Sequence, residues 1–182
     1  MRTLSPVAGL LLSAMLLAGC VPVEPTVTPA PEPSTTPVFA SEEEALAAAE
    51  EAYAEYLRIE DAVAQEGGVN PQRLREAVTD EWLEKEVEVF EAFAATGNRQ
   101  VGETSVLDFE LQQLVDSGSL VEIVAYVCVD STPTTFVDPS GADVTPSSRP
   151  ATTSLQVTLE WSDSRSKLLI ADSQPWSGES FC

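Results

Sequence analysis

The spacing of apolar residues changes near Gly97, and this change limits the fold more than any other feature of the chain. Before Gly97, apolar residues recur every three or four positions, which is the pattern of amphipathic helices. After Gly97 they alternate with polar residues, which is the pattern of strands that bury one face. Helices followed by a run of antiparallel strands predict an α+β domain in which the helices pack on a sheet.

Three helices are expected before the change of period. The first begins at Ser41, because Ser41 and Glu44 form a capping box, and it ends near Gln65, before two glycines. A short second helix starts at Asn70, an N-cap residue followed by proline, and a third starts at Thr79. We interpret the aromatic residues of these helices as core, with a ligand pocket as the alternative. They are Tyr53, Tyr56, Trp82, Phe90 and Phe93.

Four strands are expected after the change of period. They cover residues 106–114, 120–130, 153–161 and 167–173. In the first strand, the alternation places Leu107 and Phe109 on the apolar face. In the second and most regular strand, Tyr126, Cys128 and Asp130 lie opposite the apolar face. The sequence therefore predicts a sheet with one face against the helices and a second face that needs another cover.

The first 19 residues have the composition of an export signal. Arg2 gives a basic start, and the apolar run that follows is shorter than the roughly 20 residues that span a bilayer. The run ends in the sequence Leu-Ala-Gly-Cys at 17–20, which resembles the lipobox of bacterial lipoproteins. This resemblance implies that Cys20 is lipidated, becomes the first mature residue and holds the protein on the extracytoplasmic face of the cell membrane. The alternative is a plain signal peptide with an incidental cysteine.

Residues 20–40 and 41–182 differ in composition. The segment 20–40 is rich in Pro and Thr and poor in residues that could pack in a core, so it is expected to be a semi-extended linker. The chain carries a net charge of −21, and loss of Arg2 with the signal takes the mature chain to about −22. Such acidity argues against nucleic acid and against charge-driven binding to anionic lipid. The lipid anchor is therefore the expected contact with the membrane.

Two cysteines remain in the expected domain. Cys128 and Cys182 form an even pair in an exported chain, which predicts a disulfide. Two free thiols or a metal site are the alternatives, although two cysteines without any histidine make a poor metal site. If Cys128 faces away from the apolar side, the C-terminal tail must cross the second face of the sheet. Trp176 and Phe181 would then pack on that face.

The order and length of the elements over 41–182 resemble the NTF2-like (SnoaL-like) cone fold, in which a curved sheet wraps a long first helix. A cystatin-like helix-on-sheet domain is the second choice. The whole chain is similar to small actinobacterial lipoproteins of unknown function that carry such a domain. The features behind this resemblance are the lipobox, the helix from Ser41, the strand motif at 125–130 and the ending at 176–182.

The sequence offers little catalytic chemistry. The absence of histidine removes Ser-His-Asp and Cys-His catalysis and His-ligated metals, so we expect no metal and no cofactor. The expected role is a non-catalytic one, in which the domain binds an envelope protein or a small apolar ligand. The alternative is an isomerase or hydratase, because some cone-fold isomerases pair a carboxylate base with a tyrosine. The residues of this alternative are Asp130, Asp172, Tyr53, Tyr56 and Tyr126.

Overall fold

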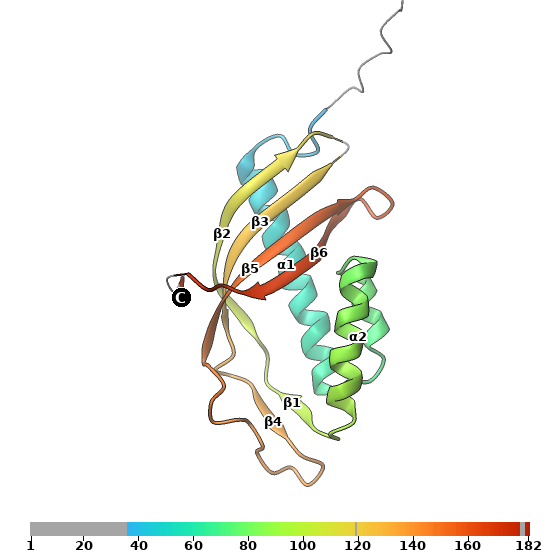
Figure 1. Cartoon of the computed structure of the whole chain (residues 1–182), viewed down its shortest axis with the longest axis vertical. Coiled ribbons are helices and arrows are strands. Elements are labelled where there is room, and N and C mark those ends of the chain that lie inside the picture. Colours follow the sequence, from blue (N-terminus) through green and yellow to red (C-terminus); the bar gives the residue numbers. More distant parts are fainter. Residues whose placement is uncertain (1–35, 119, 179–180) are drawn as a thin grey trace, which may run out of the picture. The chain divides into compact units, whose positions relative to one another are not determined.

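A long helix lies against one face of a curved, four-stranded antiparallel sheet in the computed structural model of the protein (Figure 1). The structure describes residues 36–118, 120–178 and 181–182. The expected signal peptide, the expected lipidation site Cys20 and most of the expected linker lie outside the described residues. No helix in the described part of the chain is long and apolar enough to cross a membrane. Helices packed on an antiparallel sheet form the α+β architecture that the sequence predicts.

Helix α1 (Glu42–Gln65) is the longest helix, and its two ends form as expected. The Ser41 hydroxyl accepts a hydrogen bond from the Glu44 amide at 3.2 Å, which satisfies one of the free amides of the first turn. The helix ends at a two-glycine turn, where Gly68 has a φ of +80°. A Cβ at Gly68 would also lie 2.6 Å from the carbonyl oxygen of Phe90, so only glycine fits there.

Two shorter helical segments follow. They are η1 (Pro71–Glu76), a 3₁₀ helix, and α2 (Asp80–Ala94), whose N-cap residue Thr79 accepts a hydrogen bond from the Trp82 amide at 3.3 Å. Asn70 does not cap η1 as the sequence predicts. Asn70 adopts a left-handed conformation (φ 54°, ψ 57°), and its side chain makes no capping bond. The residue instead turns the chain between α1 and η1, a conformation that Asn tolerates better than most residues.

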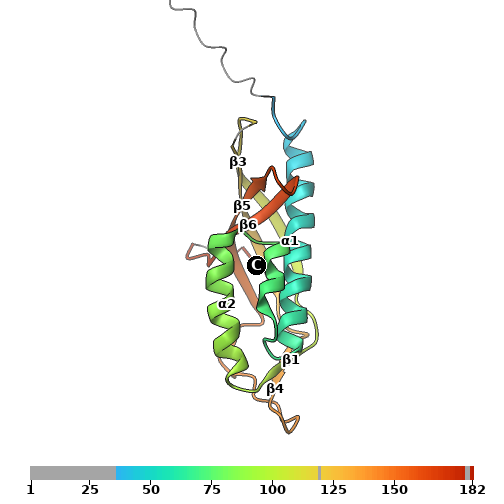
Figure 2. The same cartoon turned by 90° about the vertical axis from the view of Figure 1, so that its right-hand side faces the viewer.

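The main sheet has the order β2-β3-β5-β6, and every neighbouring pair is antiparallel. Its strands are β2 (Ser105–Asp116), β3 (Val121–Asp130), β5 (Thr152–Ser162) and β6 (Lys167–Pro175). A second sheet pairs β1 (Arg99–Val101) with β4 (Thr135–Val137). The sequence does not predict this second sheet, because three-residue strands are too short to show alternation. Helices α1 and α2 lie on the same side of the main sheet (Figure 2).

Backbone hydrogen bonds attach the helical half to the edge strand β6. The Ile170 amide donates to the Ala77 carbonyl at 2.9 Å, and the Ile170 carbonyl accepts from the Thr79 amide at 2.9 Å. These two bonds fix the start of α2 beside the sheet. They also satisfy backbone groups of an edge strand that would otherwise be open to pairing with another chain.

The core lies between α1 and the inner face of the main sheet. Tyr53 and Val63 on α1 are at most 1% exposed, and Ile123, Val127 and Leu159 on β3 and β5 are fully buried. Each large apolar side chain buried in this way contributes about 1.5–3 kcal/mol. The helix period of α1 and the strand period of β3 therefore meet in one core, as the sequence predicts.

Strand β2 departs from the predicted alternation near its start. Leu107, which we expected on the inner face, is 60% exposed. The pairing of β2 with β3 shifts between Val106 and Asp108, so Leu107 has no partner in the register. A bulge of this kind reverses the facing of the residues beyond it. Val106 and Phe109 therefore pack against the core, while Leu107 points to solvent.

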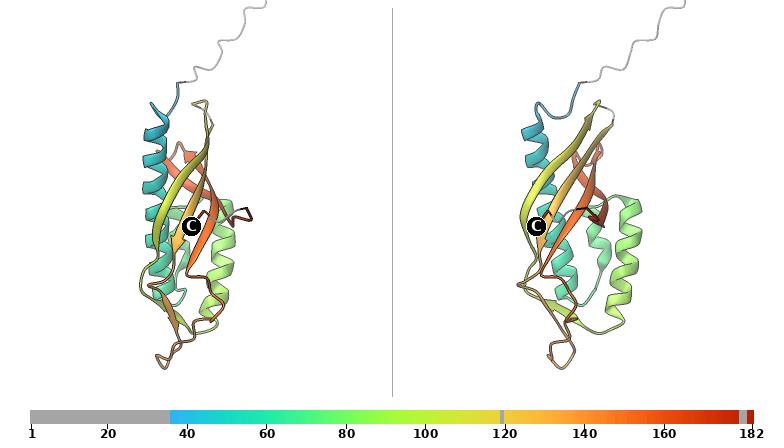
Figure 3. Two further views of the ribbon diagram at one scale, coloured as in Figure 1. Left: turned by 90° about the vertical axis from the view of Figure 1, so that its left-hand side faces the viewer. Right: turned by 60° about the vertical axis from the view of Figure 1, so that its left-hand side comes forward.

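The C-terminal tail lies on part of the outer face of the main sheet (Figure 3). A disulfide joins Cys128 on β3 to Cys182, which is the pairing that the sequence predicts. The Tyr126 ring lies 4.4 Å from the Trp176 ring and 6.1 Å from the Phe181 ring, measured between centroids. The tail therefore covers the second face of the sheet around Tyr126, while Asp108 and Glu110 on the neighbouring strand stay exposed.

The domain begins a few residues earlier than the expected boundary at residue 41. Phe39 is only 9% exposed, and its ring packs edge-on against Trp161 with the centroids 5.8 Å apart. Asp116, at the end of β2, accepts hydrogen bonds from the Val38 amide at 3.0 Å and the Phe39 amide at 2.9 Å. The end of the expected linker is thus fixed to the β2–β3 hairpin.

Candidate ligand-binding pocket

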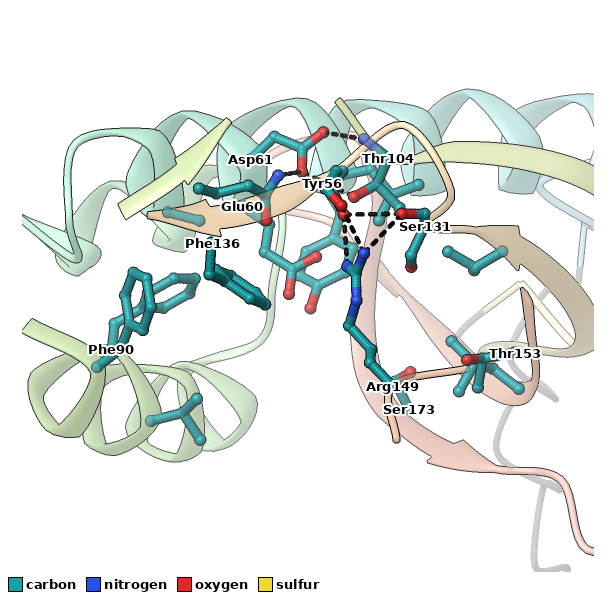
Figure 4. Close-up of a pocket in the computed structure, with 18 of the residues that line it drawn as sticks. Tyr56, Glu60, Asp61, Phe90, Thr104, Ser131, Phe136, Arg149, Thr153 and Ser173 are labelled. Carbon is teal, nitrogen blue, oxygen red and sulfur yellow. Dashed lines mark hydrogen bonds between the residues drawn. The ribbon is translucent and has the colours of Figure 1, made fainter. Parts of the chain in front are cut away.

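A cavity of about 410 Å³ lies between the helices and the sheet (Figure 4). Its volume falls within the range of about 300–1,000 Å³ that is usual for small-molecule sites. Side chains from α1, α2, both sheets and the connection between β4 and β5 line it. Its polar lining residues are Tyr53, Tyr56, Glu60, Asp61, Gln100, Thr104, Ser131, Thr134, Arg149, Thr153 and Ser173.

Helix α1 supplies the charged wall of the cavity because of its residue spacing. Tyr56, Glu60 and Ala64 follow one another at four-residue steps, so they lie along one stripe of the helix. All three line the cavity. The stripe that buries Tyr53 and Tyr56 in the core therefore also carries the Glu60 carboxyl into the same space.

A buried carboxylate on α2 is bound by two aromatic side chains. Glu86 is only 7% exposed, and its Oε1 accepts hydrogen bonds from the Tyr56 hydroxyl at 2.7 Å and from Trp82 Nε1 at 2.8 Å. Burial raises the pKa of Glu86, and the two hydrogen bonds act in the opposite direction. Burial, together with the charges of Glu60 and Glu86, also raises the pKa of Tyr56 well above its usual value. Tyr56 is therefore a neutral donor that joins α1 to α2.

Glu60 has the most strongly perturbed carboxyl group of the pocket. Burial raises its pKa to about 8, and the charges of Glu86 and Asp61 act in the same direction. A carboxyl group with such a pKa is mostly protonated at neutral pH, and it then donates a hydrogen bond as well as accepting one. It also loses its proton within a range of pH that proteins encounter.

The neighbouring carboxyl group of Asp61 accepts three structural hydrogen bonds. Asp61 is 7% exposed and accepts from Gln100 Nε2 at 2.5 Å, from the Thr104 amide at 2.7 Å and from Thr104 Oγ1 at 2.9 Å. These bonds tie α1 to strand β1 and to the segment that joins β1 to β2. We therefore assign Asp61 to the support of the pocket wall.

Arg149 reaches the pocket from the long connection between β4 and β5 (Figure 4). Its guanidinium donates to Thr134 Oγ1 and to the Thr134 carbonyl, both at 2.5 Å, and to the Ser131 carbonyl at 3.0 Å. It also lies 5.6 Å from the centre of the Phe136 ring. Among the described residues, no carboxylate oxygen lies within 4.0 Å of this guanidinium. The charge of Arg149 is held by neutral oxygens and an aromatic face.

The structure separates the residues that the sequence suggested for an enzyme. Tyr53 and Tyr56 line the pocket, whereas Tyr126 packs under the C-terminal tail on the other face of the sheet. Asp130 binds the Thr132 amide at 2.7 Å, and its hydrogen bonds with Thr132 lower its pKa. Asp172 precedes Ser173 on β6. Because Ser173 lines the pocket and neighbouring strand residues face opposite ways, Asp172 faces away from it.

The carboxyl groups that lie beside Tyr56 are those of Glu60 and Glu86, which were not among the residues suggested for an enzyme. Glu60 lies four residues after Tyr56, and Glu86 lies four residues after Trp82, each on the apolar face of its helix. A carboxylate on the apolar stripe of an amphipathic helix is the signal that could have found them. Arg149 gave no such signal, because it comes from a long connection without periodicity.

Comparison with known proteins defines the fold but not the activity. No protein-family model matches the chain, and no curated protein matches it. Among solved structures, the chain is similar to the intermembrane space region of the chloroplast protein ARC6, with a TM-score of 0.52 and 13% sequence identity. The match covers 73% of this chain and 97% of that region. At this identity the likeness shows a shared α+β fold alone.

Proposed function

We propose that this protein is a lipid-anchored domain on the extracytoplasmic face of a membrane, and that it binds a small molecule in the pocket between α1, α2 and the sheet. The observation that carries the binding role is the cavity of about 410 Å³, in which aromatic rings and polar side chains converge. Small-molecule sites combine apolar surface with polar groups that fix the orientation of the ligand.

The lipid anchor rests on the sequence. Cys20 ends a lipobox-like motif, and the Pro- and Thr-rich segment after it leads into the domain at Val38. A disulfide is typical of exported proteins, and the Cys128–Cys182 bridge supports an oxidising compartment. In a bacterial host, a palmitate analogue should label the full-length protein, and Cys20→Ala should abolish the label. Equal labelling of both forms would contradict the anchor.

The binding role is tested by filling the cavity. Ser173→Phe places a ring in the pocket, whereas Ser164→Phe places the same ring on an exposed turn. We expect 4-fluorobenzyl alcohol to bind the wild type and the Ser164→Phe control, and to bind Ser173→Phe at least tenfold more weakly. Fluorine NMR of the probe measures this binding. Equal binding to both variants would place the probe outside the cavity and contradict the proposal.

One observation favours a second role, an isomerase that moves a proton within a carbonyl substrate. Glu60 has a pKa of about 8 and lies beside Tyr56, so it exchanges protons near neutral pH. In this role Glu60 takes a proton from the carbon next to the carbonyl and returns it to another carbon. The wild type should then exchange the α-hydrogens of cyclopentanone for deuterium, and Glu60→Gln should not. Exchange at the background rate in both would leave binding as the role of the pocket.

A further inference from the structure

Aromatic rings form much of the pocket wall. Tyr53 and Tyr56 lie on α1 with their ring centres 5.7 Å apart, and Phe93 on α2 lies 5.7 Å from Phe136 on β4. Phe90, which is 6% exposed, adds a further ring from α2. The face of an aromatic ring carries negative potential and attracts a cation within about 6 Å, most strongly where water is excluded.

The charged groups around the cavity are unequal in sign. Glu60 and Asp61 line it, and the Glu86 carboxyl lies directly behind the Tyr56 hydroxyl. Arg149 is the cation that lines it, and its guanidinium is already bound to oxygens of Ser131 and Thr134. Carboxyl groups therefore outnumber the cation, and the whole chain adds a long-range attraction for cations through its charge of −21.

One hydroxyl group in the same wall has no hydrogen-bond partner in the described part of the chain. The Tyr53 residue is 1% exposed and lines the cavity, and its hydroxyl makes no hydrogen bond to any of the described residues. The hydroxyl oxygen itself is not fully enclosed by protein atoms, so it keeps access to a partner outside the protein. The Tyr53 hydroxyl is therefore available to a polar group of a bound molecule.

We infer that the pocket binds a small organic cation, an ammonium or trimethylammonium compound whose positive nitrogen lies near Glu60 and whose alkyl groups contact the aromatic wall. This inference rests on the proposed binding role and names the class of ligand. In such a complex, Glu60 pairs with the positive charge of the ligand and the rings of α1, α2 and β4 contact its alkyl groups. The Tyr53 hydroxyl forms a hydrogen bond with a polar group of the ligand.

Binding of a cation at this place is coupled to a proton. The groups that act on Glu60 are Asp61 and Tyr56 on its own helix and Glu86 on α2, and Arg149 of the β4–β5 connection lines the same cavity. With a pKa of about 8, Glu60 must release its proton at neutral pH before it pairs with a cation. Affinity for a cation should therefore rise about tenfold per pH unit below pH 8 and level off above it. An anionic ligand would show the opposite slope.

Three probes of nearly one shape separate charge from shape. They are choline, its uncharged carbon analogue 3,3-dimethyl-1-butanol, and the anion 3,3-dimethylbutanoate. Calorimetric titration of the full-length protein in a non-ionic detergent should give choline at least tenfold higher affinity than the alcohol at pH 8, with the anion weakest. At pH 7, titrations in buffers of different ionisation heat should show release of about one proton per bound choline.

Matched variants identify the group that responds. Glu60→Gln should reduce choline affinity to that of the alcohol and remove its pH dependence, while binding of the alcohol stays unchanged and shows an intact pocket. Glu50→Gln removes the same charge from an exposed position of α1 and should change none of these values.

Two results would overturn the inference. In the first, the alcohol or the anion binds as tightly as choline, or none of the three binds while 4-fluorobenzyl alcohol does. The ligand is then not a cation, but the proposed binding role stands. If 4-fluorobenzyl alcohol also fails to bind, the proposed binding role fails with it.

Discussion

The two faces of the main sheet are both covered by aromatic residues, but the covers are built in different ways. On the outer face, Trp176 and Phe181 of the tail pack on Tyr126, and the Cys128–Cys182 disulfide fixes the tail. On the inner face, the helices bring carboxyl groups into the space between the rings and leave a cavity. The tail on the outer face is therefore held by ring contacts and by one disulfide.

The difference shows where the domain gives up stability. Burying a carboxyl group is unfavourable unless its charge is lost or paired, and the raised pKa values of Glu60 and Glu86 report this penalty. On the outer face, hydrogen bonds with Thr132 lower the pKa of Asp130, so this carboxylate carries no comparable penalty. A chain that keeps destabilising groups in a cavity, next to a well-packed face, points to a role for the cavity.

The largest expected effect comes from the outer face. Cys128→Ala with Cys182→Ala opens a loop with a sequence separation of 54 residues, which should lower the free energy of unfolding by about 4 kcal/mol. Urea unfolding of the double variant and the wild type measures the difference. Under conditions where the variant stays folded, we expect 4-fluorobenzyl alcohol to bind the pocket within about twofold of the wild type. Loss of binding in the folded variant would show that the two faces are not independent.

An effect of about half that size is expected on the inner face, and it depends on pH. The pKa of Glu60 is about 8 in the folded protein against an ordinary value of 4.5, so the folded state holds a proton that the unfolded state has released. Stability is therefore greatest below about pH 4.5 for this group and falls as the pH rises to about 8. A shift of this size corresponds to about 5 kcal/mol at pH 8.5, but Glu60 keeps part of its surface in water, which weakens the penalty. Glu60→Gln should therefore flatten this fall and raise the free energy of unfolding by about 2 kcal/mol at pH 8.5.

The matched control for that experiment is Glu50→Gln, on the exposed side of the same helix. Unfolding measured from pH 5 to pH 9 should give parallel curves for the wild type and the control, and a flatter curve for Glu60→Gln. Parallel curves for all three proteins would show that Glu60 titrates normally and that the inner face carries no such penalty.

The same contrast explains what the sequence could predict. The cover of the outer face follows from local signals, because strand alternation places Tyr126 and Cys128 on one side and the second cysteine stands at the end of an aromatic tail. The core of α1 and β3 follows from periodicity in the same way. The tail cover and the core depend on residues that are near one another in the sequence or on the Cys128–Cys182 disulfide.

The inner site depends on contacts between distant segments, and the sequence could not give them. Glu86 becomes a neighbour of Tyr56 and Glu60 only when α2 packs on α1, and Arg149 reaches the cavity from a connection without periodicity. The bulge at Leu107 was missed for a related reason, because an extra residue in one strand shows only in the pairing with the other. The alternative carboxylate–tyrosine pairing, which the sequence suggested for Asp130 and Asp172, therefore involves Glu60 and Glu86 in the structure.

The smallest expected effect comes from removing one hydroxyl from each face. Tyr56→Phe deletes the hydrogen bond to the buried Glu86 and leaves that carboxyl with Trp82 alone, so it should lower the free energy of unfolding by about 1.5 kcal/mol. Tyr126→Phe keeps the ring that contacts Trp176 and should change stability by less than about 0.5 kcal/mol. Urea unfolding at pH 7 measures both. Equal losses would mean that the Tyr126 hydroxyl also contributes to stability. The two faces of the sheet would then not differ in their dependence on polar contacts.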